Sequence, residues 1–109
     1  MRTLRFLVTK DIIAEDPSCD FTGLFPGPDQ RITAEFIFSP EWDNRIKVAA
    51  FYSVLDTEYP PQIIDEENRC MIPPEALNSP AFRMQVLGSY YGLAFETNKL
   101  TVYQRGGNT

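Results

Sequence analysis

The stretch ITAEFIFSPEWDNRIKVAAFY, residues 32–52, reads as two β-strands joined by a turn. Its first half alternates apolar with mostly polar side chains, and successive side chains of a strand point to opposite faces, so this half predicts a half-buried strand. Ser39-Pro40 ends that strand, because proline cannot donate to a sheet ladder. The second half becomes apolar on both faces toward its end, which indicates a central strand. The side chains predicted to face the core from the first strand are Ile32, Ala34, Phe36 and Phe38.

The turn between the two predicted strands holds the only tryptophan of the chain, Trp42, followed by Asp43-Asn44, a pair typical of turns. A single tryptophan beside a strand is usually a core side chain. We therefore expect Trp42 to cover an open end of the core, with Phe36, Phe38 and Phe51 beside it. The alternative is that Trp42 is exposed and contacts a ligand or a partner.

The length of 109 residues corresponds to one domain, which can bury about two thirds of its unfolded surface and needs no metal or disulfide to fold. A hydrophobic content of 43% and an aromatic content of 13% predict a packed core and argue against disorder. We expect a single β-sandwich domain over residues 1–105. Residues 106–109, with the sequence GGNT, are expected to form a disordered tail.

The rest of the chain contains short extended segments separated by turn residues, with no long helical period. Residues 73–77 read as one helical turn, since proline is tolerated at a helix start. Pro60-Pro61 makes its segment either an edge strand or a poorly paired one. About eight short strands at regular spacing predict an all-β, antiparallel, immunoglobulin-like β-sandwich, with a barrel as the alternative. The further strands are expected at residues 3–8, 12–13, 58–64, 70–72, 82–88, 93–97 and 100–104.

The formal net charge of −5 argues against binding of nucleic acid, which requires clustered lysine and arginine, and against an anionic membrane surface. No apolar run approaches the roughly 20 residues of a membrane span. The apolar run near the N-terminus is too short for a signal peptide. Cys19 and Cys70 are therefore expected to be buried thiols, with a single bridge between them as the alternative.

The sequence contains no histidine, which removes the usual general base and the commonest ligand of transition metals. Two cysteines cannot close a structural zinc site, and no glycine-rich phosphate loop is present. A glycosidase needs only two carboxylates, but a sandwich of this size offers little cleft for a sugar chain. The acidic residues match no EF-hand spacing. We expect no enzyme activity, no catalytic residues, no cofactor site and no metal site.

Two regions are candidates for a protein contact. Residues 23–30, GLFPGPDQ, must form a loop, and its apolar Leu24 and Phe25 either are exposed for a partner or fold back onto the core. Tyr59 lies on the predicted edge strand, whose unpaired main-chain groups can bind another chain. A rival function is carbohydrate binding by exposed aromatic side chains. Candidates for such a platform are Trp42, Tyr52, Tyr59, Tyr90, Tyr91 and Tyr103.

Several phrases stand in a characteristic order: TLRFLV at the start, CDFTGL near residue 20, the stretch 32–52, CMIPPEAL near residue 70, FRMQVLG, and TNKLTVYQ at the end. In that order the chain resembles tail or baseplate proteins of phages and prophages of Gram-positive bacteria, and in particular the N-terminal domain of baseplate upper proteins. The most characteristic phrases are F-x-F-S-x-E-W from Phe36, I-P-x-E-x-L from Ile72, and T-N-K from Thr97.

The resemblance implies a non-catalytic β-sandwich module that docks a fibre or receptor-binding part onto a virion tail. Its partners would be other tail or baseplate proteins, or further copies of itself. It would be found in the virion tail, or in the host cytoplasm during assembly. The sequence ends at Thr109 without a coiled coil or receptor-binding domain, so we expect either a stand-alone accessory protein or one domain of a longer protein. The resemblance identifies no binding residue.

Overall fold

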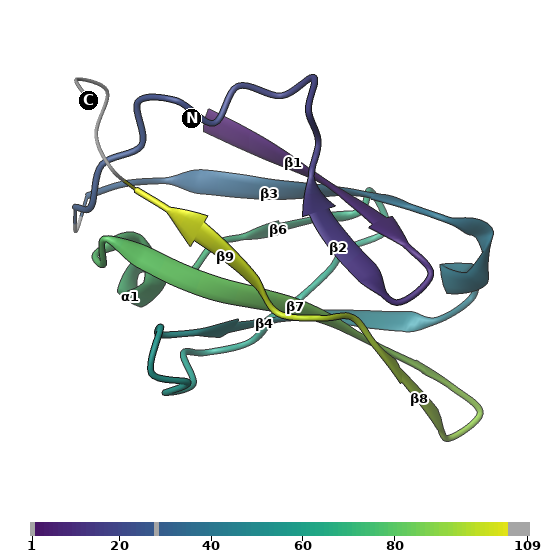
Figure 1. The fold of residues 1–109 in the computed structure, drawn as a ribbon. Coiled ribbons are helices and arrows are strands. Elements are labelled where there is room, and N and C mark those ends of the chain that lie inside the picture. Colours follow the sequence, from purple (N-terminus) through teal and green to yellow (C-terminus); the bar gives the residue numbers. More distant parts are fainter. Residues whose placement is uncertain (1, 28, 105–109) are drawn as a thin grey trace.

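The computed structural model describes residues 2–27 and 29–104 (Figure 1). The predicted tail, residues 106–109, and the last residue of the predicted domain lie outside the described residues. The described chain forms nine strands, one 3-10 turn (η1) and one α-helical turn (α1), which is the helix predicted at residues 73–77. The elements are β1 Arg2–Thr9, β2 Ile12–Glu15, β3 Ile32–Phe38, η1 Pro40–Trp42, β4 Ile46–Tyr52, β5 Gln62–Ile63, β6 Arg69–Met71, α1 Pro74–Leu77, β7 Ala81–Tyr90, β8 Leu93–Glu96 and β9 Leu100–Tyr103.

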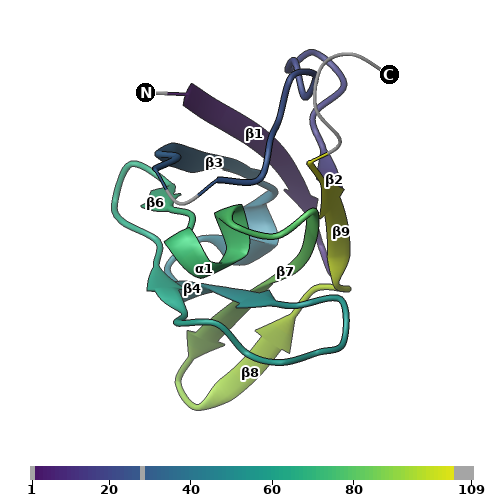
Figure 2. The ribbon, with the colours of Figure 1, turned by 90° about the vertical axis from the view of Figure 1, so that its left-hand side faces the viewer.

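The strands form two packed sheets, which confirms the prediction of an all-β sandwich. One sheet has the order β2-β1-β3-β6, and the other has the order β5-β4-β7-β8. Strand β9 pairs with the first part of β7, whereas β8 pairs with its last part. The two layers are seen from the end in Figure 2, where α1 lies at the near end of the sandwich.

The strands of the stretch 32–52 have the predicted buried faces but do not pair with each other. Strand β3 lies in the first sheet and β4 in the second, so η1 carries the chain from one layer to the other. Alternation of side chains shows which face of a strand is buried, but it does not identify the strand beside it. Strand β4 is interior, between β5 and β7, as expected.

One strand pair departs from the predicted antiparallel arrangement. Strands β1 and β3 are parallel, with Arg2 opposite Ile32 and Val8 opposite Phe38. A parallel pair requires a long connection, and here the chain makes β2 and then the loop of residues 16–31 before β3 begins. The remaining pairs between described strands are antiparallel.

Trp42 is fully buried. It is the last residue of η1, the turn between β3 and β4, which lies at the end of the sandwich opposite α1 (Figure 1). Its ring lies against Phe38 and Phe95, with centroid distances of 5.5 and 4.6 Å. Its Nε1–H donates to the carbonyl oxygen of Lys10 at 2.7 Å, so the polar atom of the ring is satisfied. Trp42 is therefore a core side chain and is not a surface contact, as the sequence predicted. Gly88 makes room for it, because a Cβ there would lie 2.7 Å from Trp42 Cζ3.

One long side of the sandwich is closed by hydrogen bonds between the sheets. Asn98, between β8 and β9, donates its N–H to the carbonyl oxygen of Asp11 at 3.1 Å. Its Oδ1 accepts the N–H of Ile13 on β2 at 2.8 Å. On the opposite long side, the outermost strands are β5 and β6, and the chain crosses between them through residues 64–68. That side contains the candidate functional site.

Candidate functional site

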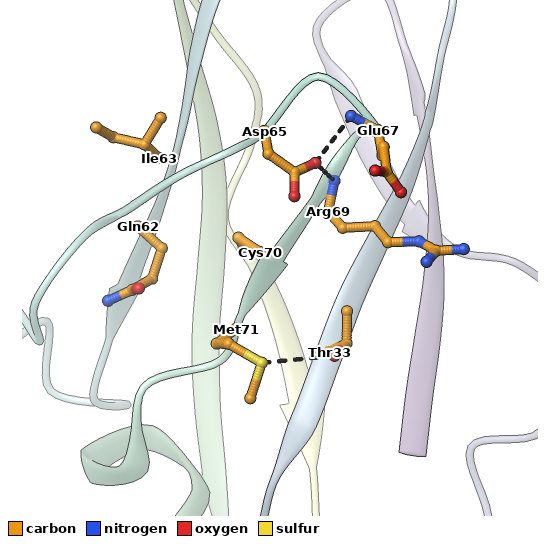
Figure 3. A pocket seen from close by; sticks show the side chains of 8 residues that line it. All are labelled: Thr33, Gln62, Ile63, Asp65, Glu67, Arg69, Cys70 and Met71. Carbon is orange, nitrogen blue, oxygen red and sulfur yellow. Dashed lines mark hydrogen bonds between the residues drawn. The ribbon is translucent and has the colours of Figure 1, made fainter. Parts of the chain in front are cut away.

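A groove of about 330 Å³ lies between the edge strands β5 and β6 (Figure 3). Its volume is at the lower end of the range for ligand sites, roughly 300–1,000 Å³. Residues of three strands and of the β5–β6 connection form its walls. The lining residues are Thr33, Gln62, Ile63, Asp65, Glu67, Arg69, Cys70 and Met71.

The β5 wall is an edge strand, as Pro60-Pro61 predicted. Pairing with β4 begins at Gln62, just after the two prolines. The N–H of Ile64 donates to the carbonyl oxygen of Lys47 at 3.0 Å, and hydrogen-bonded and non-hydrogen-bonded pairs alternate along an antiparallel ladder. Ile63 therefore occupies a non-hydrogen-bonded position opposite Val48, and its N–H and C=O point away from β4. Its side chain is 76% exposed.

The β6 wall has the same alternation. The N–H of Ile72 donates to the carbonyl oxygen of Ile32, and the N–H of Phe36 donates to that of Asn68. The positions between these pairs, Arg69 and Met71, therefore point their main-chain groups away from β3. Those of Arg69 are bound by Asp65, whose carboxylate accepts its N–H at 3.0 Å and whose N–H donates to its C=O at 2.9 Å.

Met71 is thus the β6 residue whose main-chain groups face outward beside the groove. Its side chain is partly exposed, and its sulfur accepts the hydroxyl of Thr33 at 3.5 Å (Figure 3). Each edge strand therefore has one residue beside the groove whose main-chain N–H and C=O point away from its own sheet and are not bound by Asp65. These residues are Ile63 on one wall and Met71 on the other.

The connection between the two walls is held by hydrogen bonds and is acidic. The Asp65 carboxylate also accepts the N–H of Glu67 at 2.9 Å, and Asn68 closes the turn with a φ of 63°. Asparagine tolerates this left-handed backbone conformation. These bonds fix the loop backbone and leave the side chains of Glu66 and Glu67 exposed.

The one basic side chain that lines the groove is already paired. Arg69 donates from Nε and Nη2 to Oε2 of Glu35, at 3.0 and 2.9 Å, and Arg5 donates to Oε1 of Glu35 at 2.9 Å. These hydrogen bonds, from Arg5 first and Arg69 second, hold the pKa of Glu35 below its usual range. The charge of Arg69 is therefore compensated, and the groove rim is acidic.

The cysteines are unbridged. Cys70 is buried, and Cys19 is half-buried, with its sulfur 3.3 Å from the N–H of Arg5. Burial, aided by the negative charge of Asp65, raises the pKa of the Cys70 thiol to about 12. A thiol with this pKa stays protonated at neutral pH and is a poor nucleophile. Within residues 2–27 and 29–104, no group of three or more histidine, cysteine, aspartate or glutamate side chains is arranged to hold a metal ion.

The predicted contact residues do not form one surface. Leu24 is only 4% exposed and belongs to the core, which corrects its assignment as a contact residue. The loop is held inward by the N–H of Gly27, which donates to the carbonyl oxygen of Leu77 at 3.0 Å. Phe25 is 53% exposed, as a contact residue must be. Tyr59 is partly buried against the core, with its N–H bound to the carbonyl oxygen of Phe51.

The aromatic candidates for a sugar platform are also dispersed. Trp42 and Tyr52 are buried. Tyr90 and Tyr91 are exposed at the tip of the β7–β8 hairpin, with ring centroids 4.5 Å apart and ring planes at 75°. Two rings in this edge-to-face arrangement do not form one flat surface. Tyr103, on β9, is half exposed.

A scan against models of protein families found no match for this chain, and a search of the curated proteins found none either. Among the described helices, none has the length and apolar character needed to cross a membrane.

Proposed function

We propose that this chain is a non-catalytic structural module of a phage or prophage tail or baseplate, and that it acts by protein–protein assembly. The observation that carries the proposal is the β5–β6 groove, where Ile63 and Met71 direct main-chain groups outward. Unpaired strand edges bind further strands, which is a common mode of protein recognition. The thiol of the groove, Cys70, is held protonated and is a poor nucleophile, and the one arginine of the groove is paired with Glu35.

The tail context depends on the resemblance to the N-terminal domain of baseplate upper proteins. The three characteristic phrases have clear structural roles in this chain, which supports the idea that they are fold determinants. The phrase from Phe36 forms the end of β3 and η1, and the phrase from Ile72 leads into α1. The phrase from Thr97 forms the segment that closes one side of the sandwich. We expect the sandwich to be of the immunoglobulin-like kind.

Carbohydrate binding is a second candidate function, favoured by one observation. Tyr91 is 89% exposed and has a φ of 49°, a conformation that is unusual for a bulky residue and occurs preferentially at functional sites. The adjacent Gly92, with a φ of 79°, completes a two-residue turn of the kind that normally has asparagine or aspartate before the glycine.

Immunogold electron microscopy tests the proposed function. Antibodies against the purified chain are applied to particles released by the strain that carries its gene, with particles from a strain deleted for the gene as the control. We expect gold at the tail tip or baseplate. Unlabelled particles, together with a monomeric chain that binds sugars on a glycan array, would favour the carbohydrate-binding function.

A further inference from the structure

We propose that the β5–β6 groove binds an extended, basic segment of a partner protein, in which apolar residues alternate with lysine or arginine. This inference rests on the proposed assembly function and names the chemistry of the partner. It is carried by three features of the groove: the direction of its main-chain groups, the charge of its rim, and the apolar side chains that border it.

The main chain provides the first contact. Ile63 presents both a donor and an acceptor away from β4, and Met71 does the same away from β3. An extended segment beside either residue can form a pair of main-chain hydrogen bonds. The pairing surface is short, because prolines precede β5 and Pro73 follows β6. Side-chain contacts must therefore supply much of the selectivity.

The charge of the rim selects a basic segment. Asp65, Glu66 and Glu67 follow one another at the end of the groove, and Arg69 is held by Glu35. A neighbouring hollow shares Asp65 with the groove and contains two basic residues, Arg45 and Lys47. Each of these side chains contacts an aromatic ring. Arg45 lies 4.7 Å from the ring centroid of Phe95, and Lys47 lies 5.2 Å from that of Phe38. The negative charges of the rim are therefore available to a partner.

The exposed apolar side chains favour a partner segment in which apolar residues alternate with basic ones. Ile63 and Met71 are exposed hydrophobic residues that border the groove on its two walls, with Met71 at the end away from Asp65 and Glu67 (Figure 3). Their sequence neighbours Ile64, Cys70 and Ile72 are buried, so both side chains lie on the outer faces of their sheets. Successive side chains of a bound strand point to opposite sides. A segment that pairs with β5 and alternates apolar with basic residues can thus cover Ile63 with its apolar side chains and direct its cations into the groove, toward Glu67.

A second copy of the same chain fits this groove less well. Self-pairing of two β5 edges about a two-fold axis would bring together two copies of the same patch, including its acidic residues. Like charges placed opposite each other across an interface oppose association. The acidic rim and the net charge of −5 therefore favour a different, basic partner over another copy of this chain.

Fluorescence anisotropy with a labelled synthetic peptide tests the inference. The probe is a short peptide that alternates valine with lysine, and its controls are the same peptide with glutamate in place of lysine and with N-methylated valines. We expect saturable binding of the lysine peptide that weakens with added salt, and at least about tenfold weaker binding of both controls.

Variants of the protein provide the second part of the test. Ile63→Pro removes an outward-facing N–H without removing a bond to β4, and should weaken binding about tenfold, whereas Ile63→Val should not. Glu67→Lys should weaken binding more than Glu96→Lys, which makes the same charge change on β8, outside the residues that line the groove.

Three outcomes would overturn the inference: no saturable binding, equal binding of the N-methylated peptide, or unchanged affinity in both Ile63→Pro and Glu67→Lys. If Ile63→Pro fails to fold, the N-methylated peptide still decides the matter. Self-association that Ile63→Pro abolishes would identify a second copy as the occupant and overturn the basic partner. Gold-labelled tails without peptide binding would overturn only this inference, whereas peptide binding with unlabelled particles would overturn only the tail assignment.

Discussion

At the scale of single residues, the contact between Gly88 and Trp42 decides the packing at one end of the sandwich. The β7 backbone passes so close to the indole ring that a methyl group at residue 88 would lie 2.7 Å from Cζ3 and 3.1 Å from Cε3. A core side chain of this size that is fully buried cannot move without disturbing Phe38 and Phe95.

We therefore expect Gly88→Ala to lower the free energy of unfolding by roughly 1–3 kcal/mol, as overpacking in a core does. Gly27→Ala is the matched control, because its Cβ would make only an ordinary contact, 3.5 Å from Gln30 Cγ. Urea denaturation of both variants measures the difference. Equal stability of the two variants would mean that Trp42 is not fixed against β7.

Trp42→Ala should be more costly, about 3–5 kcal/mol, because it removes a large buried side chain and leaves a cavity. Thermal melting of the variant measures this loss. An unchanged melting temperature would show that Trp42 is exposed and would favour a role in binding.

Glu35 gives the stability of the protein a dependence on pH. Its pKa is lowered in the folded chain by hydrogen bonds from Arg5 and Arg69, so the stabilisation is present above the usual glutamate pKa of about 4.3 and is lost as the pH falls through the lower folded value. Denaturation of wild type and Glu35→Gln at neutral and acidic pH should show a smaller loss of stability on acidification in the variant. An identical loss in both proteins would contradict this role.

At the scale of elements, the segment between β8 and β9 joins the two sheets. Asn98 binds the N–H of Ile13 through Oδ1, and Thr97 accepts the N–H of Val86 through Oγ1 at 3.0 Å. The T-N-K segment, residues 97–99, thus connects β8 to β9 alongside β7, and it also holds the edge strand β2 in place.

Asn98→Ala should lower the free energy of unfolding by about 1 kcal/mol, since it leaves a partly buried N–H without its acceptor. Amide hydrogen exchange should become faster at Ile13, which reports the loss locally. The control is Asn78→Ala, a substitution of the same kind at an exposed position at the end of α1. Unchanged protection of Ile13 would show that Asn98 does not hold β2.

The two thiols differ in their environments, and a thiol reagent should distinguish them. In the folded protein at neutral pH we expect modification of the half-buried Cys19 and slow modification of Cys70, whose burial raises its pKa to about 12. In urea without reductant, both thiols should react. A chain with no reactive thiol in urea would instead contain the Cys19–Cys70 bridge.

At the scale of the whole molecule, local sequence signals predicted the strands, the turns and the buried faces. The positive φ of Asn44 agrees with the turn predicted at Asp43-Asn44. The sequence did not show that β3 and β4, although joined by a turn, lie in different sheets, because period-two alternation is the same whether two strands lie side by side or in facing sheets.

The functional site could be predicted only in part. Pro60-Pro61 correctly indicated an edge strand, but the groove also requires that β6 end the other sheet on the same side. That placement depends on contacts between distant parts of the chain. The sequence left open whether Leu24 faces the core or a partner, because an apolar residue in a loop has the same local sequence signal in both cases; it faces the core.

The central claim is that the β5–β6 side of the sandwich is an unpaired edge available to another strand. Residue-resolved amide hydrogen exchange of the free monomer, followed by NMR, tests it most directly. We predict slow exchange at Ile64 and Ile72, whose N–H groups are bound within the sheets, and fast exchange at Ile63 and Met71, whose N–H groups point outward. Slow exchange at all four residues would show that this side of the molecule is closed and would contradict the claim.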